Sequence, residues 1–235
     1  MLGIKDPYAG LPTLNKKGLR DCQHEAISEL EGSFRAGQNR ALLVLATGAG
    51  KTYTACMAAY RFLAYTPMKR ILFLVDRNNL GKQAEGEFGM FRLTENGDPF
   101  NTIFTVNRLK SNKVPSDSNV VISTIQRLFS LLSGKEITDD DDDDDDSATG
   151  EVELPGNIQL PPDFFDVIII DECHRSIYGN WRKVLVYFNT AKMIGLTATP
   201  VPETMAFFNN NRVVNYTFER SIVDGVNVDG RVYRI

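Results

Sequence analysis

The chain has 235 residues, of which 43% are hydrophobic and 24% are charged, an ordinary composition for a soluble globular protein with a substantial core. No apolar run approaches the roughly 18 residues that a membrane span requires, and no stretch resembles a signal peptide. The three cysteines have no paired spacing, which favours free thiols in a reducing compartment over a cysteine metal site. We therefore expect a cytoplasmic protein of one large domain, with no membrane partner.

The formal net charge of −4 is dominated by residues 139–146, which are eight consecutive aspartates. Removing these eight negative charges changes the net charge from −4 to +4, so the rest of the chain is mildly basic. Such a charge is compatible with a nucleic-acid partner without requiring one. We expect an acidic, disordered insertion at about residues 133–162, because the aspartates repel one another and cannot be buried. An acidic mimic of nucleic acid is the alternative interpretation.

The first elements of the chain are a lead-in and a helix. Residues 1–18 contain several glycines and prolines and little periodicity, which predicts a lead-in that packs loosely or links to an upstream segment. Apolar residues then recur at helical spacing and predict an amphipathic helix over residues 19–36.

A phosphate-binding loop is predicted next. Residues 41–45 read as a strand buried on both faces, and they lead into Ala-Thr-Gly-Ala-Gly-Lys-Thr at residues 46–52. Helical spacing resumes at Thr52, so backbone N–H groups at this helix N-terminus can cradle phosphates. Lys51 would supply a charge for the β and γ phosphates, and the Thr52 hydroxyl would ligate Mg²⁺. Leu45 stands where the full pattern has its first glycine, so a glycine-rich helix start without a ligand is the alternative.

The rest of the chain alternates between strands and helices. This alternation predicts an α/β fold, a mostly parallel sheet with helices on both faces. The stretch after Pro200 is weakly patterned and stops without a finished domain. The expected strands are residues 70–76, 101–106, 119–123, 165–170 and 192–196, and the expected helices are residues 53–65, 78–91 and 124–132.

Two carboxylates follow the strand at residues 165–170. Parallel sheets place their chemistry at the carboxyl ends of strands, where Asp171 and Glu172 stand. Hydrolysis of a nucleoside triphosphate needs a phosphate cradle, a magnesium ion and a carboxylate that orients or deprotonates water. We expect Asp171 to hold Mg²⁺ and Glu172 to activate the water. Cys173 and His174 could suggest a metal site, but no third ligand lies at metal-site spacing.

The order of four motifs resembles that of superfamily 2 helicases and translocases. The motifs resemble the glutamine motif and motifs I, II and III of that superfamily: Leu19-Arg20-x-x-Gln23, residues 46–52, Asp171-Glu172-Cys173-His174 and Thr197-Ala198-Thr199. Residues 75–80, 123–128, 171–178 and 224–228 look closer still to the motor (R) subunit of type I restriction enzymes.

This resemblance spans about residues 19–235 without the insertion, and it implies the first RecA-like domain of a DNA-translocating ATP hydrolase. It implies ATP and Mg²⁺ as cofactors, and duplex DNA and the modification and specificity subunits of a restriction complex as partners. In that family a nuclease domain precedes the motor, and a second RecA-like domain supplies an arginine finger. We see neither in this sequence and therefore expect weak activity from the chain alone.

The resemblance also implies four groups of site residues, and His174 is expected to hydrogen-bond toward Thr197 or Thr199. The nucleotide would contact Arg20, Gln23 (which would read the adenine), Thr47, Gly48, Ala49, Gly50, Lys51 and Thr52; catalysis would involve Lys51, Asp171 and Glu172; coupling to movement would involve His174, Thr197, Ala198 and Thr199; and Arg77 and Thr124 would lie near the DNA backbone.

Three other functions compete with this interpretation. Another superfamily 2 DNA or RNA helicase is the nearest alternative. A P-loop phosphotransferase would need an acceptor pocket and usually lacks the Thr197-Ala198-Thr199 element. A nucleotide-gated binding module would tolerate loss of Glu172, so turnover separates the enzyme from the module.

Overall fold

A parallel sheet organises the computed structural model, which describes residues 6–93, 96–111, 113–134, 160–175 and 178–228. Its seven strands lie in the order β3-β4-β2-β5-β6-β1-β7, and every pairing between neighbours is parallel. The strands are β1 (Arg40–Leu45), β2 (Ile71–Val75), β3 (Val106–Arg108), β4 (Val120–Thr124), β5 (Val167–Ile170), β6 (Lys192–Thr197) and β7 (Arg212–Tyr216).

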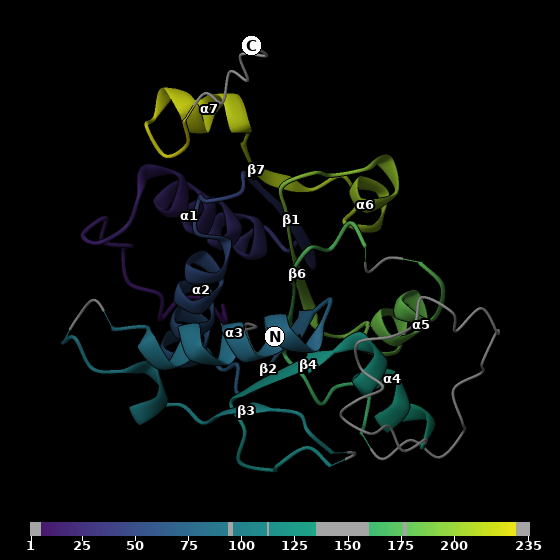
Figure 1. Ribbon diagram of the computed structural model, residues 1–235. Coiled ribbons are helices and arrows are strands. Elements are labelled where there is room, and N and C mark those ends of the chain that lie inside the picture. The colour runs from purple at the N-terminus through teal and green to yellow at the C-terminus, as the bar shows by residue number, and fades with distance from the viewer. Residues whose placement is uncertain (1–5, 94–95, 112, 135–159, 176–177, 229–235) are drawn as a thin grey trace, which may run out of the picture.

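Helices connect these strands and cover the sheet (Figure 1). Parallel strands require such crossovers, because each strand must start again at the same edge of the sheet. The helices are α1 (Asp21–Arg35), α2 (Lys51–Tyr65), α3 (Asn78–Met90), α4 (Ile125–Ser133), α5 (Gly179–Tyr187), α6 (Pro202–Phe207) and α7 (Phe218–Val223), with a 3-10 turn, η1 (Phe100–Thr102), before β3.

The hydrophobic core has two halves, one on each face of the sheet. Along β1, Leu43 and Leu45 point into the half that α1, α2 and α3 cover, whereas Leu42 and Val44 point into the half under α4, α5 and α6. Successive side chains of a strand alternate between faces, so a strand buried on both faces must be apolar throughout. The predicted α/β fold with helices on both faces is therefore confirmed.

The strand predicted at residues 101–106 is wrong. Residues 100–102 form η1, and sheet pairing begins only at Val106. The Phe100 ring is fully buried, with its centroid 5.2 Å from those of Phe88 and Phe104. Aromatic residues four apart turn toward one core here, and this packing overrides the strand propensity of the segment.

The stretch after Pro200 is ordered as α6, β7 and α7, although its sequence pattern is weak. β7 is an edge strand in which only Val214 and Tyr216 are buried, so it lacks the continuous apolar run of the central strands. α7 has six residues and is capped by Thr217, whose hydroxyl accepts a hydrogen bond from the Arg220 N–H. Short elements of this kind carry too few apolar residues to show a period.

The described part of the lead-in, residues 6–18, does not pack loosely. Tyr8 and Leu11 are buried against the α1–α2 half of the core, and the Arg61 guanidinium donates to Pro12 O at 2.6 Å. At the two ends of the insertion predicted at about residues 133–162, α4 runs to Ser133, and Leu160 is buried in the other half of the core. Residues 135–159, with the aspartate run, lie outside the described residues.

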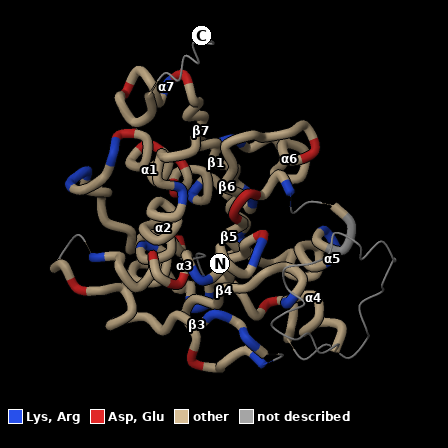
Figure 2. The backbone as a smooth tube through the Cα atoms, viewed as in Figure 1, with Lys and Arg blue, Asp and Glu red and all other residues tan. Residues whose placement is uncertain are grey.

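The positively and negatively charged residues are mixed along the described chain. Figure 2 shows Lys and Arg interspersed with Asp and Glu over the described backbone in this view. Within the described part of the chain, we find no helix that is both long and apolar enough to cross a membrane.

Candidate functional site

The predicted phosphate-binding loop connects β1 to α2 at the carboxyl edge of the sheet. The backbone has φ +82° at Gly48 and +86° at Gly50, a region that L side chains disfavour and glycine adopts freely. The Ala49 N–H donates to Ala46 O at 3.1 Å, and α2 then starts at Lys51. The glycines therefore allow the chain to turn sharply into the N-terminus of a helix, where the helix dipole favours an anion.

The start of α1 holds this loop through two side chains. Arg20 Nη1 donates to Gly48 O at 2.6 Å, and Gln23 Nε2 donates to Ala49 O at 3.2 Å. Gln23 Oε1 accepts from the Arg20 N–H at 3.0 Å, so the same amide also caps α1. The resemblance implied an adenine contact for Gln23, but nothing in the sequence indicated that Gln23 also supports the phosphate-binding loop, because Gln23 and Ala49 are 26 positions apart and meet only in the fold.

Asp171 and Glu172 lie at the end of β5, as predicted. The Asp171 N–H donates to Leu74 O at 2.9 Å, which continues the ladder to β2, and Asp171 Oδ1 accepts from the Glu172 N–H at 3.0 Å. Glu172 has φ +44°, which is rare for a residue with a side chain. The two carboxylates have different partners, because Asp171 accepts from the backbone of its neighbour whereas Glu172 lies beside Lys51 and His174.

Glu172 faces the phosphate-binding loop. Its Oε1 is 3.4 Å from Lys51 Nζ, and its Oε2 is 3.6 Å from His174 Nδ1. Burial, with a smaller contribution from Glu172, raises the pKa of Asp171 to about 6. A cation bound beside Asp171 would favour the charged carboxylate and oppose this shift.

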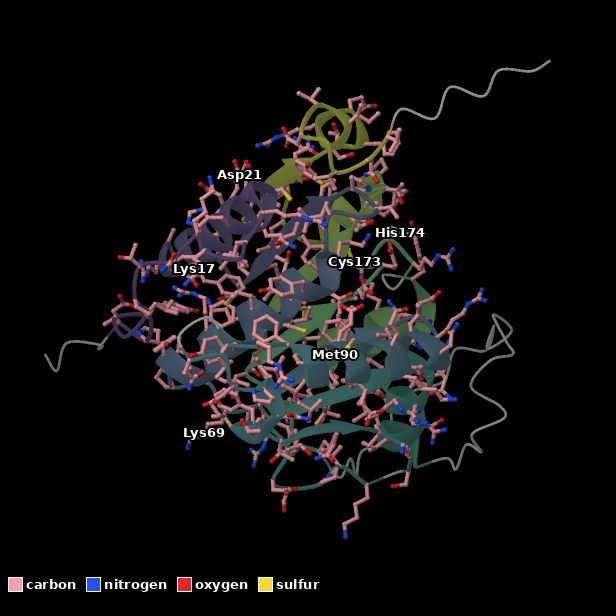
Figure 3. All side chains as sticks on the ribbon, turned by 60° about the vertical axis from the view of Figure 1, so that its left-hand side comes forward. Lys17, Asp21, Lys69, Met90, Cys173 and His174 are labelled. Atoms are coloured by element: carbon pink, nitrogen blue, oxygen red, sulfur yellow. The ribbon has the colours of Figure 1, made fainter. Side chains whose placement is uncertain are left out.

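His174 makes the predicted contact with the end of β6. Its Nδ1 is 3.0 Å from Thr197 Oγ1, and the same oxygen accepts from the Thr199 N–H at 3.1 Å. The neighbouring Cys173 is fully buried, and burial raises the pKa of its thiol. Cys173 is thus a core residue, whereas His174 links β5 to β6. Figure 3 labels both residues. The described residues contain no group of three or more His, Cys, Asp or Glu that could hold a metal on their own.

A cleft of about 390 Å³ opens beside these groups, and Glu172, His174 and Thr199 are among the residues that line it. Arg175 Nη1 lies 2.8 Å from Asp76 Oδ2 at its wall, and the Arg77 side chain is 64% exposed. The cleft is lined by Thr47, Asp76, Arg77, Asn79, Leu80, Glu172, His174, Arg175, Ala198 and Thr199.

Thr124 is not among the residues that line the cleft. It is 4% exposed, and its Oγ1 caps α4 by accepting from the Arg127 N–H at 3.2 Å. Its DNA contact stays a prediction, as does that of Arg77.

One side-chain contact with the phosphate-binding loop was not predicted from the sequence. Asn227, beyond α7, donates from Nδ2 to Thr47 O at 2.8 Å. The only signal in the sequence was its place in residues 224–228, one of the stretches that resemble the R subunit.

Comparison with known families agrees with this geometry. The family model described as type III restriction enzyme, res subunit, matches residues 16–202, which is most of the chain. The chain belongs to this family. The resemblance to superfamily 2 helicases and to the type I R subunit, which the motifs indicated, is confirmed.

Two curated relatives of this family member are type I restriction enzyme subunits. The chain is 33% identical over 242 residues to the EcoKI endonuclease subunit of Escherichia coli (strain K12), an alignment with 94% of this chain and 18% of the relative. It is 35% identical over 229 residues to the EcoAI endonuclease subunit of Escherichia coli, with 93% of this chain and 24% of the relative. The chain thus spans about a fifth of the length of these relatives.

Solved structures share the fold. A fragment described as an HsdR subunit of a type I restriction enzyme from Vibrio vulnificus YJ016 has a TM-score of 0.61 and 26% identity, and the match covers 95% of this chain and 35% of that chain. The UvsW helicase from bacteriophage T4 has a TM-score of 0.54 and 16% identity, over 91% of this chain and 63% of that chain. The fold is therefore that of a RecA-like helicase domain.

Proposed function

We propose that this family member is the first, ATP-binding motor domain of a DNA-translocating ATPase in a type I restriction system. The observation that carries the proposal is the position of Lys51, whose Nζ lies 3.4 Å from Glu172 Oε1. This distance puts the phosphate-binding loop and the water-activating carboxylate on two sides of one cleft. A γ-phosphate would have to displace this ion pair, because 3.4 Å leaves no room for it, and it would then contact Lys51 while Glu172 orients the attacking water.

The side chains of this cleft suit ATP with Mg²⁺. A Cβ at Gly48 or Gly50 would meet the Asn227 or Gln23 side chain that contacts the loop, so both positions favour glycine, and the α2 N-terminus presents its N–H groups to phosphates. Mg²⁺ is usually held by one or two protein oxygens together with phosphates and water, a set that Asp171 and the Thr52 hydroxyl can provide. When bound, the ion would neutralise charge on the transferring phosphoryl group.

The adenine would lie next to the start of α1. Gln23 donates one amide proton to Ala49 O and keeps a second N–H for a base. Arg20, whose guanidinium also contacts the loop at Gly48 O, lies beside it. In this arrangement the side chains that recognise the base also hold the phosphate cradle.

Duplex DNA and the restriction-complex subunits are the partners that we propose, on the similarity to type I endonuclease subunits. His174, Thr197, Ala198 and Thr199 would pass the state of the nucleotide to the DNA-contacting elements, because they connect Glu172 to the end of β6. The nuclease domain and the second motor domain would come from sequence outside these 235 residues.

Steady-state ATP hydrolysis by the chain, alone and with duplex DNA, tests this proposal against a binding module. An arginine finger from a second domain contributes roughly 10³ to 10⁵ in rate, so we expect turnover far below 1 s⁻¹. Glu172→Gln should remove this trace of activity and leave ATP affinity unchanged. Hydrolysis that Glu172→Gln does not alter would contradict the proposed role, and the absence of any turnover would favour the module.

A further inference from the structure

The segment after α7 returns to the phosphate-binding loop from the far end of the chain. Asn227 Nδ2 donates to Thr47 O and to Ser221 Oγ, both at 2.8 Å. Ser221 is buried, and its Oγ donates in turn to Phe218 O at 2.5 Å. Both protons of the Asn227 amide are therefore used, and its orientation is fixed.

The same side chain also lies against the next residue of the loop. A Cβ on Gly48 would lie 3.0 Å from Asn227 Oδ1. The Gly48 carbonyl is held by Arg20 at 2.6 Å, and the Ala49 carbonyl by Gln23 at 3.2 Å. Three consecutive carbonyls of the loop, from Thr47 to Ala49, thus accept hydrogen bonds from side chains.

These carbonyls determine where the loop N–H groups point. A peptide unit is planar and trans, so its C=O and the following N–H point in opposite directions. Fixing the Thr47 carbonyl toward Asn227 therefore directs the Gly48 N–H away from Asn227. In the same way, fixing the Ala49 carbonyl toward Gln23 directs the Gly50 N–H away from Gln23.

The segment that carries Asn227 is anchored independently of the loop. The backbone N–H groups of Val226 and Asn227 donate to Ser221 O at 2.8 and 3.1 Å. Arg220 pairs with Glu25 of α1 at 2.7 Å, and α7 lies beside α1 in Figure 1. Loss of the Asn227 amide should therefore leave the segment folded.

We propose that Asn227 is a positioning residue for the nucleotide, which orients the Gly48 N–H toward the phosphates by holding the Thr47 carbonyl. The inference rests on the proposed ATP site and adds a residue outside its motifs. By linkage, a ligand that needs the oriented N–H also favours the docked segment 221–227, so nucleotide binding and docking reinforce each other.

Titration with a fluorescent ADP analogue tests this role in three variants of the chain. Asn227→Ala should bind about fivefold more weakly, the effect of one lost hydrogen bond. Asn227→Asp has the same shape but cannot donate and adds a negative charge, so it should bind more weakly still. Val228→Ala is the matched control, because Val228 is the next residue and is 87% exposed. Val228→Ala should keep the thermal midpoint of the nucleotide-free wild type, and the two Asn227 variants should stay folded with a midpoint lowered by only a few degrees.

Wild-type binding and Lys51→Ala separate the two claims. If the wild type does not bind the analogue, the proposed ATP site is wrong. If the wild type binds, Lys51→Ala does not, and both Asn227 variants bind within twofold of Val228→Ala, then only the role of Asn227 is overturned.

Hydrogen exchange of the wild type decides the matter if the variants do not fold. Addition of ADP should slow exchange at the Val226 and Asn227 amides together with the Gly48 amide, because the two regions are coupled. Protection confined to residues 47–52 would overturn the inference, since a structural role alone couples nothing to the ligand.

Discussion

Replacing Gly50 with alanine should damage the phosphate-binding loop for two separable reasons. At φ +86° an alanine is strained by about 1–2 kcal/mol. Its Cβ would also collide with Gln23 Nε2, so Gln23 would have to leave Ala49 O, with the loss of a hydrogen bond worth about 1 kcal/mol. We expect the free energy of unfolding to fall by about 2–3 kcal/mol in total.

Gly37 offers a matched control. It has φ +88°, and a Cβ there would meet nothing within 4 Å. Gly37→Ala should therefore show the backbone strain alone, about 1–2 kcal/mol. Nucleotide affinity should fall at least about tenfold in Gly50→Ala, equivalent to 1.4 kcal/mol of binding energy, and stay unchanged in Gly37→Ala.

Urea unfolding and titration with a fluorescent ADP analogue measure both effects. In a Gln23→Ala background no collision remains, so the further cost of Gly50→Ala should shrink to that of Gly37→Ala. The reasoning is refuted if Gly50→Ala and Gly37→Ala are equally destabilising in the otherwise wild-type chain and bind nucleotide equally well.

Three further predictions concern the core and the insertion. Leu45→Gly would complete the phosphate-loop pattern, yet Leu45 is fully buried, so we expect the free energy of unfolding in urea to fall by about 2–5 kcal/mol and the nucleotide affinity not to rise. Tighter nucleotide binding at unchanged stability would contradict this expectation. Replacing residues 136–158 with a short Gly/Ser linker should barely change Tm, because a twofold change in loop length changes the free energy of loop closure by only about 0.6 kcal/mol. A large drop in Tm would mean that the insertion stabilises the fold. Glu31→Ala should lower the free energy of unfolding by about 3–5 kcal/mol, because it leaves the Arg61 side chain, 4% exposed, without its carboxylate; a cost under about 1 kcal/mol would refute that reason.

The sequence predicted those elements whose burial is continuous. The strands at residues 41–45 and 167–170 are buried on both faces, so they appear as unbroken apolar runs, and the loop and carboxylates that follow them lie at one edge of the sheet as expected. β7 was missed because an edge strand buries only alternate residues. The segment around Phe100 was mistaken for a strand because its aromatic residues serve a local cluster.

Contacts between distant parts of the chain could not be predicted. Asn227 and Thr47 are 180 positions apart, and no local period connects them. Gln23 and Ala49 meet only because α1 packs beside β1. The motifs therefore predicted which residues gather at this edge of the sheet, whereas the side chains that hold the loop could be identified only from the fold.

Equilibrium binding of a non-hydrolysable ATP analogue with Mg²⁺, measured by calorimetry on the wild type and on Lys51→Ala, tests the central claim most directly. Lys51 Nζ lies 3.4 Å from Glu172 Oε1, and one ion pair of this kind contributes little to stability, so its truncation should leave the far-UV circular dichroism unchanged and Tm nearly so. The account predicts saturable binding by the wild type and at least about tenfold weaker binding by Lys51→Ala, since hydrogen bonds to charged groups contribute about 1.5–3 kcal/mol. Equal affinity in a folded Lys51→Ala chain would contradict it.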